Sequence, residues 1–198
     1  MKTSATLLFC FLVGMLLWTG CGSDDEDTLT TLNYDGPNVN APQLPPGRNV
    51  FGVYFPPSET APYQGRVLES VRFYMSDIPD STIVVVYDEG PDDRTPGAEL
   101  YRRNITGRVN VTAWIDDRLN ERIVIGDRGI WLAIEVVIPP GEPFSVGCDA
   151  GRNFQPNGNL LFLSTESDWT TFEEITDPNN NGTGETVNWN IRGVLSAE

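Results

Sequence analysis

The chain has 198 residues, with 28 acidic and 13 basic side chains, a formal net charge of −15 at pH 7, and no histidine. A surface this acidic repels phosphate backbones and anionic headgroups, so we expect neither nucleic-acid binding nor electrostatic docking on a membrane. The lack of histidine excludes Ser/His/Asp and Cys/His catalytic arrangements and imidazole metal sites.

The first 20 residues have the organisation of a secretory signal peptide. Lys2 precedes an apolar run from Leu7 to Leu17, and small residues follow this run. The run is too short to span a bilayer, which takes about 20 helical residues. We therefore predict that residues 1–20 are removed from the mature protein.

The residues Trp18-Thr19-Gly20-Cys21 resemble the lipobox of bacterial lipoproteins, although Trp18 stands where that family usually has an aliphatic residue. In lipoproteins the cysteine after the cleavage site receives lipid. The resemblance therefore implies a protein attached to the membrane through lipid on Cys21, as an outer-membrane lipoprotein of the cell envelope. An ordinary secretory signal followed by an incidental cysteine is the alternative.

Residues 21–47 are predicted to form an extended tether. They are rich in Asp, Thr, Asn and Pro and end in Ala41-Pro42-Gln43-Leu44-Pro45-Pro46-Gly47. Such a segment has too little apolar surface to offset the entropy lost on ordering. Leu32 to Gly36 have strand-and-turn chemistry, so residues 32–47 are the part that can join the fold.

Residues 48–196 are predicted to form one all-β domain. Short runs of Val, Ile, Phe, Tyr and Trp alternate with Gly, Pro, Asn and Asp, and we see no convincing helix. This spacing favours an antiparallel sandwich or barrel. The predicted strands are 49–55, 66–75, 82–88, 100–105, 108–115, 122–125, 130–138, 144–149, 160–164, 169–175 and 187–195.

Period-two alternation assigns the side chains of these strands to faces. In 130–138 the even-numbered apolar residues belong to the core, and in 108–115 Val109, Val111, Ala113 and Ile115 do. The opposite faces carry aromatic, amide, acidic and arginine side chains. Aromatic rings stack on sugar rings, while Arg, Asn or Glu fix hydroxyl groups, which makes these faces candidate glycan sites. The alternative for each ring is packing beneath a loop or a third layer. The candidate ligand-binding residues are Arg72, Tyr74, Trp114, Trp131, Glu135, Asn190 and Arg192.

Several of these runs together resemble a known group of domains. The runs are Val71 to Tyr74, Val86 to Gly90, Trp131 to Glu135, Val146 to Gly151, Trp169, and Asn188 to Arg192. They resemble the jelly-roll-like β-sandwich accessory domains of surface proteins from bacteria that use type IX secretion. The resemblance implies a two-sheet antiparallel sandwich. The segment Ser23 to Asp27 resembles the acidic runs that follow the lipid cysteine in the same bacteria and direct export to the cell surface. The alternative is that this segment is a solvated spacer.

Two further features bear on chemistry. Cys148 lies in an apolar run, and we expect it to be a small buried hydrophobe, because no histidine is present to activate it. Carboxylates are the remaining catalysts, but the adjacent pairs Asp88-Glu89, Asp92-Asp93 and Asp116-Asp117 are expected at turns. Such pairs do not establish the separation across a sugar that glycoside hydrolysis requires.

The loop that begins at Asp177 has oxygen ligands at alternate positions, Asp177, Asn179 and Asn181, and glycine at the sixth, as a calcium loop does. Asn188 stands where a bidentate glutamate is expected. We therefore expect a hairpin loop, with a structural calcium ion as the alternative.

These observations lead to a functional hypothesis. We expect a lipid-anchored, surface-exposed, non-catalytic binding or adhesion module, with a glycan as its candidate ligand. The alternatives are a structural or assembly subunit that contacts another envelope protein, and a carboxylate-based glycoside hydrolase.

Overall fold

The computed structural model describes residues 30–141 and 144–197 of the chain. The predicted signal peptide, Cys21 and the acidic run behind it lie outside the described residues. Among those described, no helix has the length and apolarity needed to cross a membrane.

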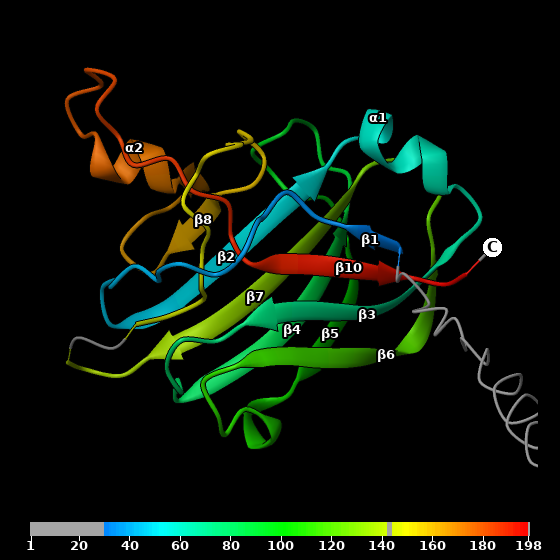
Figure 1. Ribbon diagram of the computed structural model, residues 1–198, viewed down its shortest axis with the longest axis horizontal. Helices are drawn as coiled ribbons and strands as arrows, with labels where there is room; N and C mark the ends of the chain where they lie inside the picture. The colour runs from blue at the N-terminus through cyan, green and yellow to red at the C-terminus, as the bar shows by residue number, and fades with distance from the viewer. Residues whose placement is uncertain (1–29, 142–143, 198) are drawn as a thin grey trace, which may run out of the picture.

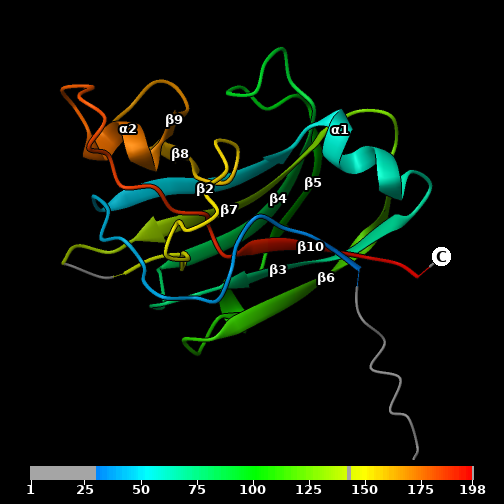
Figure 2. The ribbon, with the colours of Figure 1, turned by 45° about the horizontal axis from the view of Figure 1, so that its top comes forward.

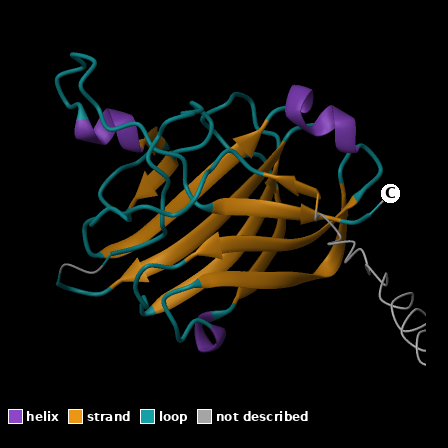
Figure 3. Cartoon of the chain, in the orientation of Figure 1, coloured by secondary structure: helices purple, strands orange, loops and turns teal. Residues whose placement is uncertain are grey.

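Ten strands make up the described fold (Figure 1). They are β1 (Thr30–Leu32), β2 (Gly47–Phe55), β3 (Val67–Tyr74), β4 (Ser81–Asp88), β5 (Glu99–Asn104), β6 (Trp114–Val124), β7 (Ile130–Ile138), β8 (Leu160–Leu163), β9 (Thr170–Thr171) and β10 (Ile191–Leu195). The helical segments are short: α1 (Pro57–Thr60), η1 (Ala61–Tyr63), η2 (Thr106–Arg108) and α2 (Phe172–Thr176). They lie at the periphery of the strands (Figure 3).

The strands form two antiparallel sheets packed as a sandwich, which confirms the predicted fold class. One sheet has the order β1-β10-β3-β6 and the other the order β5-β4-β7-β2-β8-β9. Figure 2 shows them as separate layers. Strands far apart in sequence pair in a nested manner, β1 with β10, β2 with β7, β3 with β6 and β4 with β5. This nesting is the arrangement of a long hairpin folded over on itself, as in jelly rolls.

The core lies between the two sheets and contains the residues of β7 that alternation predicts. All five even-numbered apolar residues of β7 are buried in it. Within it the Phe51 and Trp189 rings meet edge to face, with centroids 5.0 Å apart. The indole N–H of Trp189 donates to the backbone carbonyl of Leu160 at 2.8 Å, so this large ring is buried without an unsatisfied donor.

The predicted strand 108–115 is wrong. Most of 108–115 is not strand, because it contains the end of η2 and a loop. β6 begins only at Trp114 and ends at Val124, so it includes most of the predicted strand 122–125. Val109 is buried as predicted, but Val111 is 52% exposed, because the loop has no alternation to direct it inward.

The predicted strand 169–175 is instead the two-residue β9 followed by α2. The hydroxyl of Thr171 accepts from the backbone N–H of Glu174, and the Glu174 carboxylate accepts from the backbone N–H of Thr171. This reciprocal capping box starts a helix at a position where the apolar pattern alone indicates a strand.

The described part of the predicted tether is folded onto the sandwich. β1 pairs with β10, and Leu32, Ala41 and Leu44 are buried. Asn40 and Gln43 form isolated bridges with Cys148 and Phe144, in a region where 144–149 forms bridges rather than the predicted continuous strand. From residue 30 onward the chain is therefore part of the domain.

Candidate functional site

The candidate ligand-binding residues divide between two opposite surfaces of the sandwich. Arg72 and Tyr74 on β3, Trp114 on β6 and Arg192 on β10 lie on the outer face of the four-stranded sheet. Trp131 and Glu135 lie on β7, on the outer face of the six-stranded sheet. A single groove lined by Tyr74, Trp114 and Trp131 is therefore not formed.

On the four-stranded sheet the side chains gather around one ring, and we call Arg72, Tyr74, Trp114 and Arg192 the Trp114 cluster. The Cζ atoms of Arg192 and Arg72 lie 4.3 and 5.3 Å from the centroid of the Trp114 ring. The Tyr74 ring meets the same indole edge to face at 5.7 Å. Each guanidinium group thus has the position of a cation–π contact.

A buried carboxylate fixes one of the two arginines. The Asp35 side chain accepts from Arg192 Nη2 at 2.8 Å and from Nε at 3.0 Å, and from Asn190 Nδ2 at 2.6 Å. Asn190 is fully buried, so it serves to position Asp35 rather than to meet a ligand at the surface. Arg192 is held rigidly because its fork is paired with one carboxylate.

On the six-stranded sheet, Trp131 is fully buried. Its ring stacks on Tyr54 with centroids 5.1 Å apart and meets Trp169 edge to face at 5.3 Å. Trp131 therefore cannot present its ring to a ligand in this arrangement. It supports other rings that are partly exposed.

Those partly exposed rings are Tyr87 on β4, Phe162 on β8 and Trp169 just before β9, and we call them the aromatic patch. They surround buried Val50, Val85 and Ala133, which pack against them. Trp169 lies directly over Gly52: a Cβ at that position would come within 2.8 Å of the indole ring. Glycine at position 52 therefore leaves the space that the Trp169 ring fills.

Beside the aromatic patch, Glu135 holds two arginines. Its Oε2 accepts from Arg48 Nη2 at 2.8 Å and from Arg102 Nη1 at 3.1 Å. Burial alone would raise the pKa of Glu135, but the hydrogen bonds from the two guanidinium groups outweigh it and lower that pKa. Arg48 also lies over Phe162, with Cζ 5.6 Å from the ring centroid. The patch is thus bordered by cationic donors that are already fixed in position.

Sequence reasoning missed the aromatic patch as a site. The alternation in β4 could have placed Tyr87 on the outer face, because Ile83, Val85 and Tyr87 lie on the side of the strand opposite its inward residues. Phe162 lies in a run that is apolar at every position, which carries no alternation, and Trp169 lies outside any regular strand. Neither ring could be assigned to a face from its neighbours in sequence.

The loop considered as a candidate calcium site uses its carboxylate internally. Asp177 accepts from the backbone N–H groups of Asn181, Gly182 and Thr183, and these bonds lower its pKa. Within the described ranges, no group of three or more His, Cys, Asp or Glu side chains is placed to hold a metal ion. The geometry is that of a loop closed by its first residue. The loop connects α2 to β10, so it does not join two paired strands as the predicted hairpin loop would.

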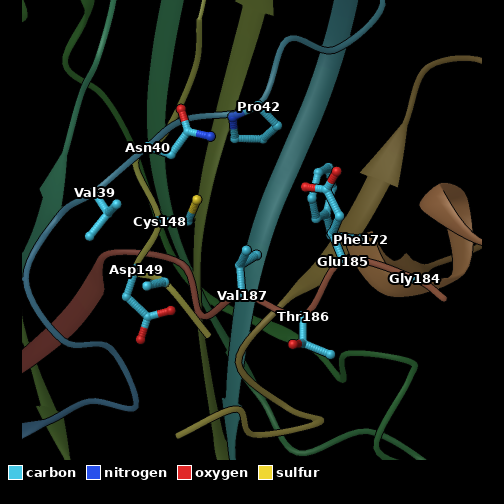
Figure 4. Close-up of a pocket in the computed structure, with 11 residues that line it drawn as sticks. Val39, Asn40, Pro42, Cys148, Asp149, Phe172, Gly184, Glu185, Thr186 and Val187 are labelled. Atoms are coloured by element: carbon cyan, nitrogen blue, oxygen red, sulfur yellow. The ribbon is translucent and has the colours of Figure 1, made fainter. Parts of the chain in front are cut away.

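A pocket of about 450 Å³ lies beside Cys148 (Figure 4). Desolvation raises the pKa of the buried Cys148 thiol to about 12, so it stays protonated at neutral pH. The carboxylate of Asp149, at the same pocket, accepts from the backbone N–H groups of Gly36, Gly151 and Asn188. In Figure 4 the Asp149 and Glu185 side chains do not face each other across the pocket. The two carboxylates therefore lack the facing arrangement that glycoside hydrolysis uses.

One of the adjacent carboxylate pairs is placed differently from the prediction. Asp116 and Asp117 lie within β6 rather than in a turn, and they point to opposite faces. Asp116 is exposed, whereas Asp117 is fully buried and paired with Arg108. Burial raises the pKa of Asp117, and its Oδ2 has no hydrogen-bond partner in the described structure.

Comparison with known proteins adds no family to this picture. No protein-family model and no curated protein matches the chain. The class that the fold defines is an all-β domain of two antiparallel sheets.

Proposed function

We propose that this protein is a non-catalytic binding module that holds carbohydrate on the outer face of its six-stranded sheet. The observation that carries the proposal is the aromatic patch. Tyr87, Phe162 and Trp169 are each partly exposed and come from separate segments on one face. Rings arranged in this way can stack on the C–H faces of successive sugar units.

The polar groups around the patch suit sugar hydroxyls. Neither the Tyr87 hydroxyl nor the Trp169 indole N–H bonds to a described residue. Burial raises the pKa of Tyr87, so the phenol keeps its proton and can donate it to a hydroxyl. Arg48 and Arg102 are held by Glu135, which limits the entropy lost when a ligand binds.

The cellular setting is proposed from the sequence. Lipid on Cys21 would hold the domain at the outer membrane, on the cell surface, and the resemblance to accessory domains of type IX secretion-associated proteins fits a surface module. The acidic composition leaves lipid as the means of attachment. Detergent phase partitioning of the full chain and of Cys21→Ala tests this: loss of the detergent-phase fraction in the variant is expected, and equal partitioning would exclude the anchor.

Affinity electrophoresis of the protein in gels containing single polysaccharides tests the binding function. Phe162→Ala is expected to weaken binding about tenfold, as the loss of one stacking contact. Phe144→Ala is the matched control, because Phe144 is 46% exposed and lies outside the patch. No retardation by any polysaccharide, or equal losses in the two variants, would contradict the proposal.

A protein partner on the same face is the second candidate, and Ile83 favours it. This aliphatic side chain is partly exposed beside the aromatic patch and adds apolar area that no sugar needs. Ile83→Ser is expected to leave polysaccharide binding unchanged if the ligand is a glycan. A loss equal to that of Phe162→Ala would favour a flat protein interface and an assembly role.

A further inference from the structure

The Trp114 cluster contains an arginine whose hydrogen-bonding capacity is unused. The Arg72 side chain makes no hydrogen bond or ion pair with any residue that the structure describes; its one described side-chain contact is with the Trp114 ring. By contrast, Arg192, directly opposite it on β10, is paired with Asp35 through two nitrogens. One guanidinium group of the cluster is therefore satisfied and the other is not.

The position of Arg72 leaves its donors available. A guanidinium group held against an indole ring by a cation–π contact keeps its N–H edge free, and this edge matches the two oxygens of a carboxylate. The Tyr74 hydroxyl and the Trp114 indole N–H likewise make no hydrogen bond with a described residue. Arg72 and Tyr74 thus both contact Trp114, and all three donor-bearing side chains are partly exposed, in a chain with a net charge of −15.

We propose that Arg72, with Tyr74 and Trp114, forms a second ligand site, on the face opposite the aromatic patch, and that this site takes a carboxylate such as that of an acidic sugar. The fixed charges select a monoanion. Arg192 is neutralised by Asp35, and Asp116, exposed and directly opposite Arg72 on β6, opposes a second negative charge. A sulfate or phosphate dianion would meet more of this repulsion.

The site is distinct from the proposed glycan surface in both position and chemistry. The aromatic patch offers rings and arginines already bound to Glu135, whereas the Trp114 cluster offers a guanidinium group without an acidic partner in the described structure. An experiment can therefore disprove one of the two proposed sites without affecting the other.

NMR titration of the purified protein at constant ionic strength tests the proposal, with methyl glucuronide, acetate, methyl glucoside and sulfate as separate probes. Methyl glucuronide and acetate are expected to give saturable shifts of the Arg72 Nε–H and Trp114 indole signals, and methyl glucoside none. Equal shifts with the neutral glucoside, or tighter binding of sulfate than of the carboxylates, would overturn the carboxylate assignment.

Variants separate a specific site from general charge. Arg72→Gln is expected to abolish the saturable shift of Trp114, whereas Arg118→Gln, which removes the same charge from an exposed position of β6, is expected to retain it. Asp116→Asn is expected to tighten carboxylate binding about threefold, because it removes the negative charge directly opposite Arg72 on the neighbouring strand. Equal effects of Arg72→Gln and Arg118→Gln, or no gain in Asp116→Asn, would overturn the proposal.

Discussion

Arg72 and Arg192 lie directly opposite each other on the neighbouring strands β3 and β10, and both guanidinium groups rest against the ring of Trp114. Like charges opposite each other on a sheet are destabilising, and here an electron-rich ring and the Asp35 carboxylate offset the repulsion.

Trp114→Ala is therefore expected to lower the free energy of unfolding by about 1–2 kcal/mol, because two cation–π contacts are lost and the arginines face each other unshielded. Urea denaturation measures the change. Trp114→Phe keeps a ring and should lose less; a Phe variant as unstable as the Ala variant would show that the arginines do not depend on the ring.

Asp117 should give a pH-dependent stability. Its pKa in the folded protein is raised by burial, so its contribution favours folding below the ordinary value near 3.8 and is lost as the pH rises through the raised pKa. The stability of Asp117→Asn relative to wild type should consequently increase between pH 4 and pH 7. Denaturation at a series of pH values measures this difference. A difference that falls over the same range would contradict the raised pKa, and Asp116→Asn controls for loss of an exposed carboxylate on the same strand.

The contribution of Glu174 to stability should depend on pH in the opposite direction from that of Asp117. The Arg94 guanidinium, with Thr170 and the backbone of Thr171, lowers the pKa of Glu174 from 4.5 to about 2. Its contribution is therefore present above pH 4.5 and lost as the pH falls through about 2. Because the Arg94 pair is exposed, Glu174→Gln should cost only about 0.5–1 kcal/mol at pH 7, and the difference should vanish toward pH 2. Denaturation of both proteins across this range is the measurement, with Glu173→Gln as the helix control; a difference independent of pH would be evidence against the ionic contribution.

Gly52→Ala should displace Trp169, because the added methyl group would lie 2.8 Å from the indole ring. We expect a loss of about 1–3 kcal/mol from overpacking. Tryptophan fluorescence and thermal unfolding report the two effects. Gly107→Ala is the matched control, since nothing lies within 4 Å of its added Cβ. An unchanged Trp169 environment in Gly52→Ala would show that this glycine is not needed to seat the ring.

Cys148 should be unreactive in the folded protein. Burial raises the pKa of its thiol to about 12, so almost no thiolate forms at pH 8. Iodoacetamide labelling, read by mass spectrometry of the peptide that contains Cys148, should reach completion only after unfolding in guanidinium chloride. Rapid labelling of the native protein would show that the pocket beside Cys148 opens.

Local patterns were sufficient for much of the fold. The alternation in residues 130–138 identifies a strand and its buried face correctly, because the side-chain period of a strand is a local property of the backbone. The same reasoning fails at Thr171, where a side-chain cap, not apolar spacing, selects helix. It also fails at Val111, which lies in a loop between two elements.

The alternation along their strands also predicted that Trp114 and Trp131 point away from the core between the two sheets. This prediction is correct for both residues. Only the tertiary structure separates them, because alternation distinguishes two faces of a strand but does not specify which sheet the strand joins. β6 pairs with β3, whereas β7 pairs with β2 and β4. Those pairings between distant segments place the two tryptophans on opposite sides of the molecule, bury Trp131 beneath Trp169, and bring Arg72 and Arg192 together around Trp114.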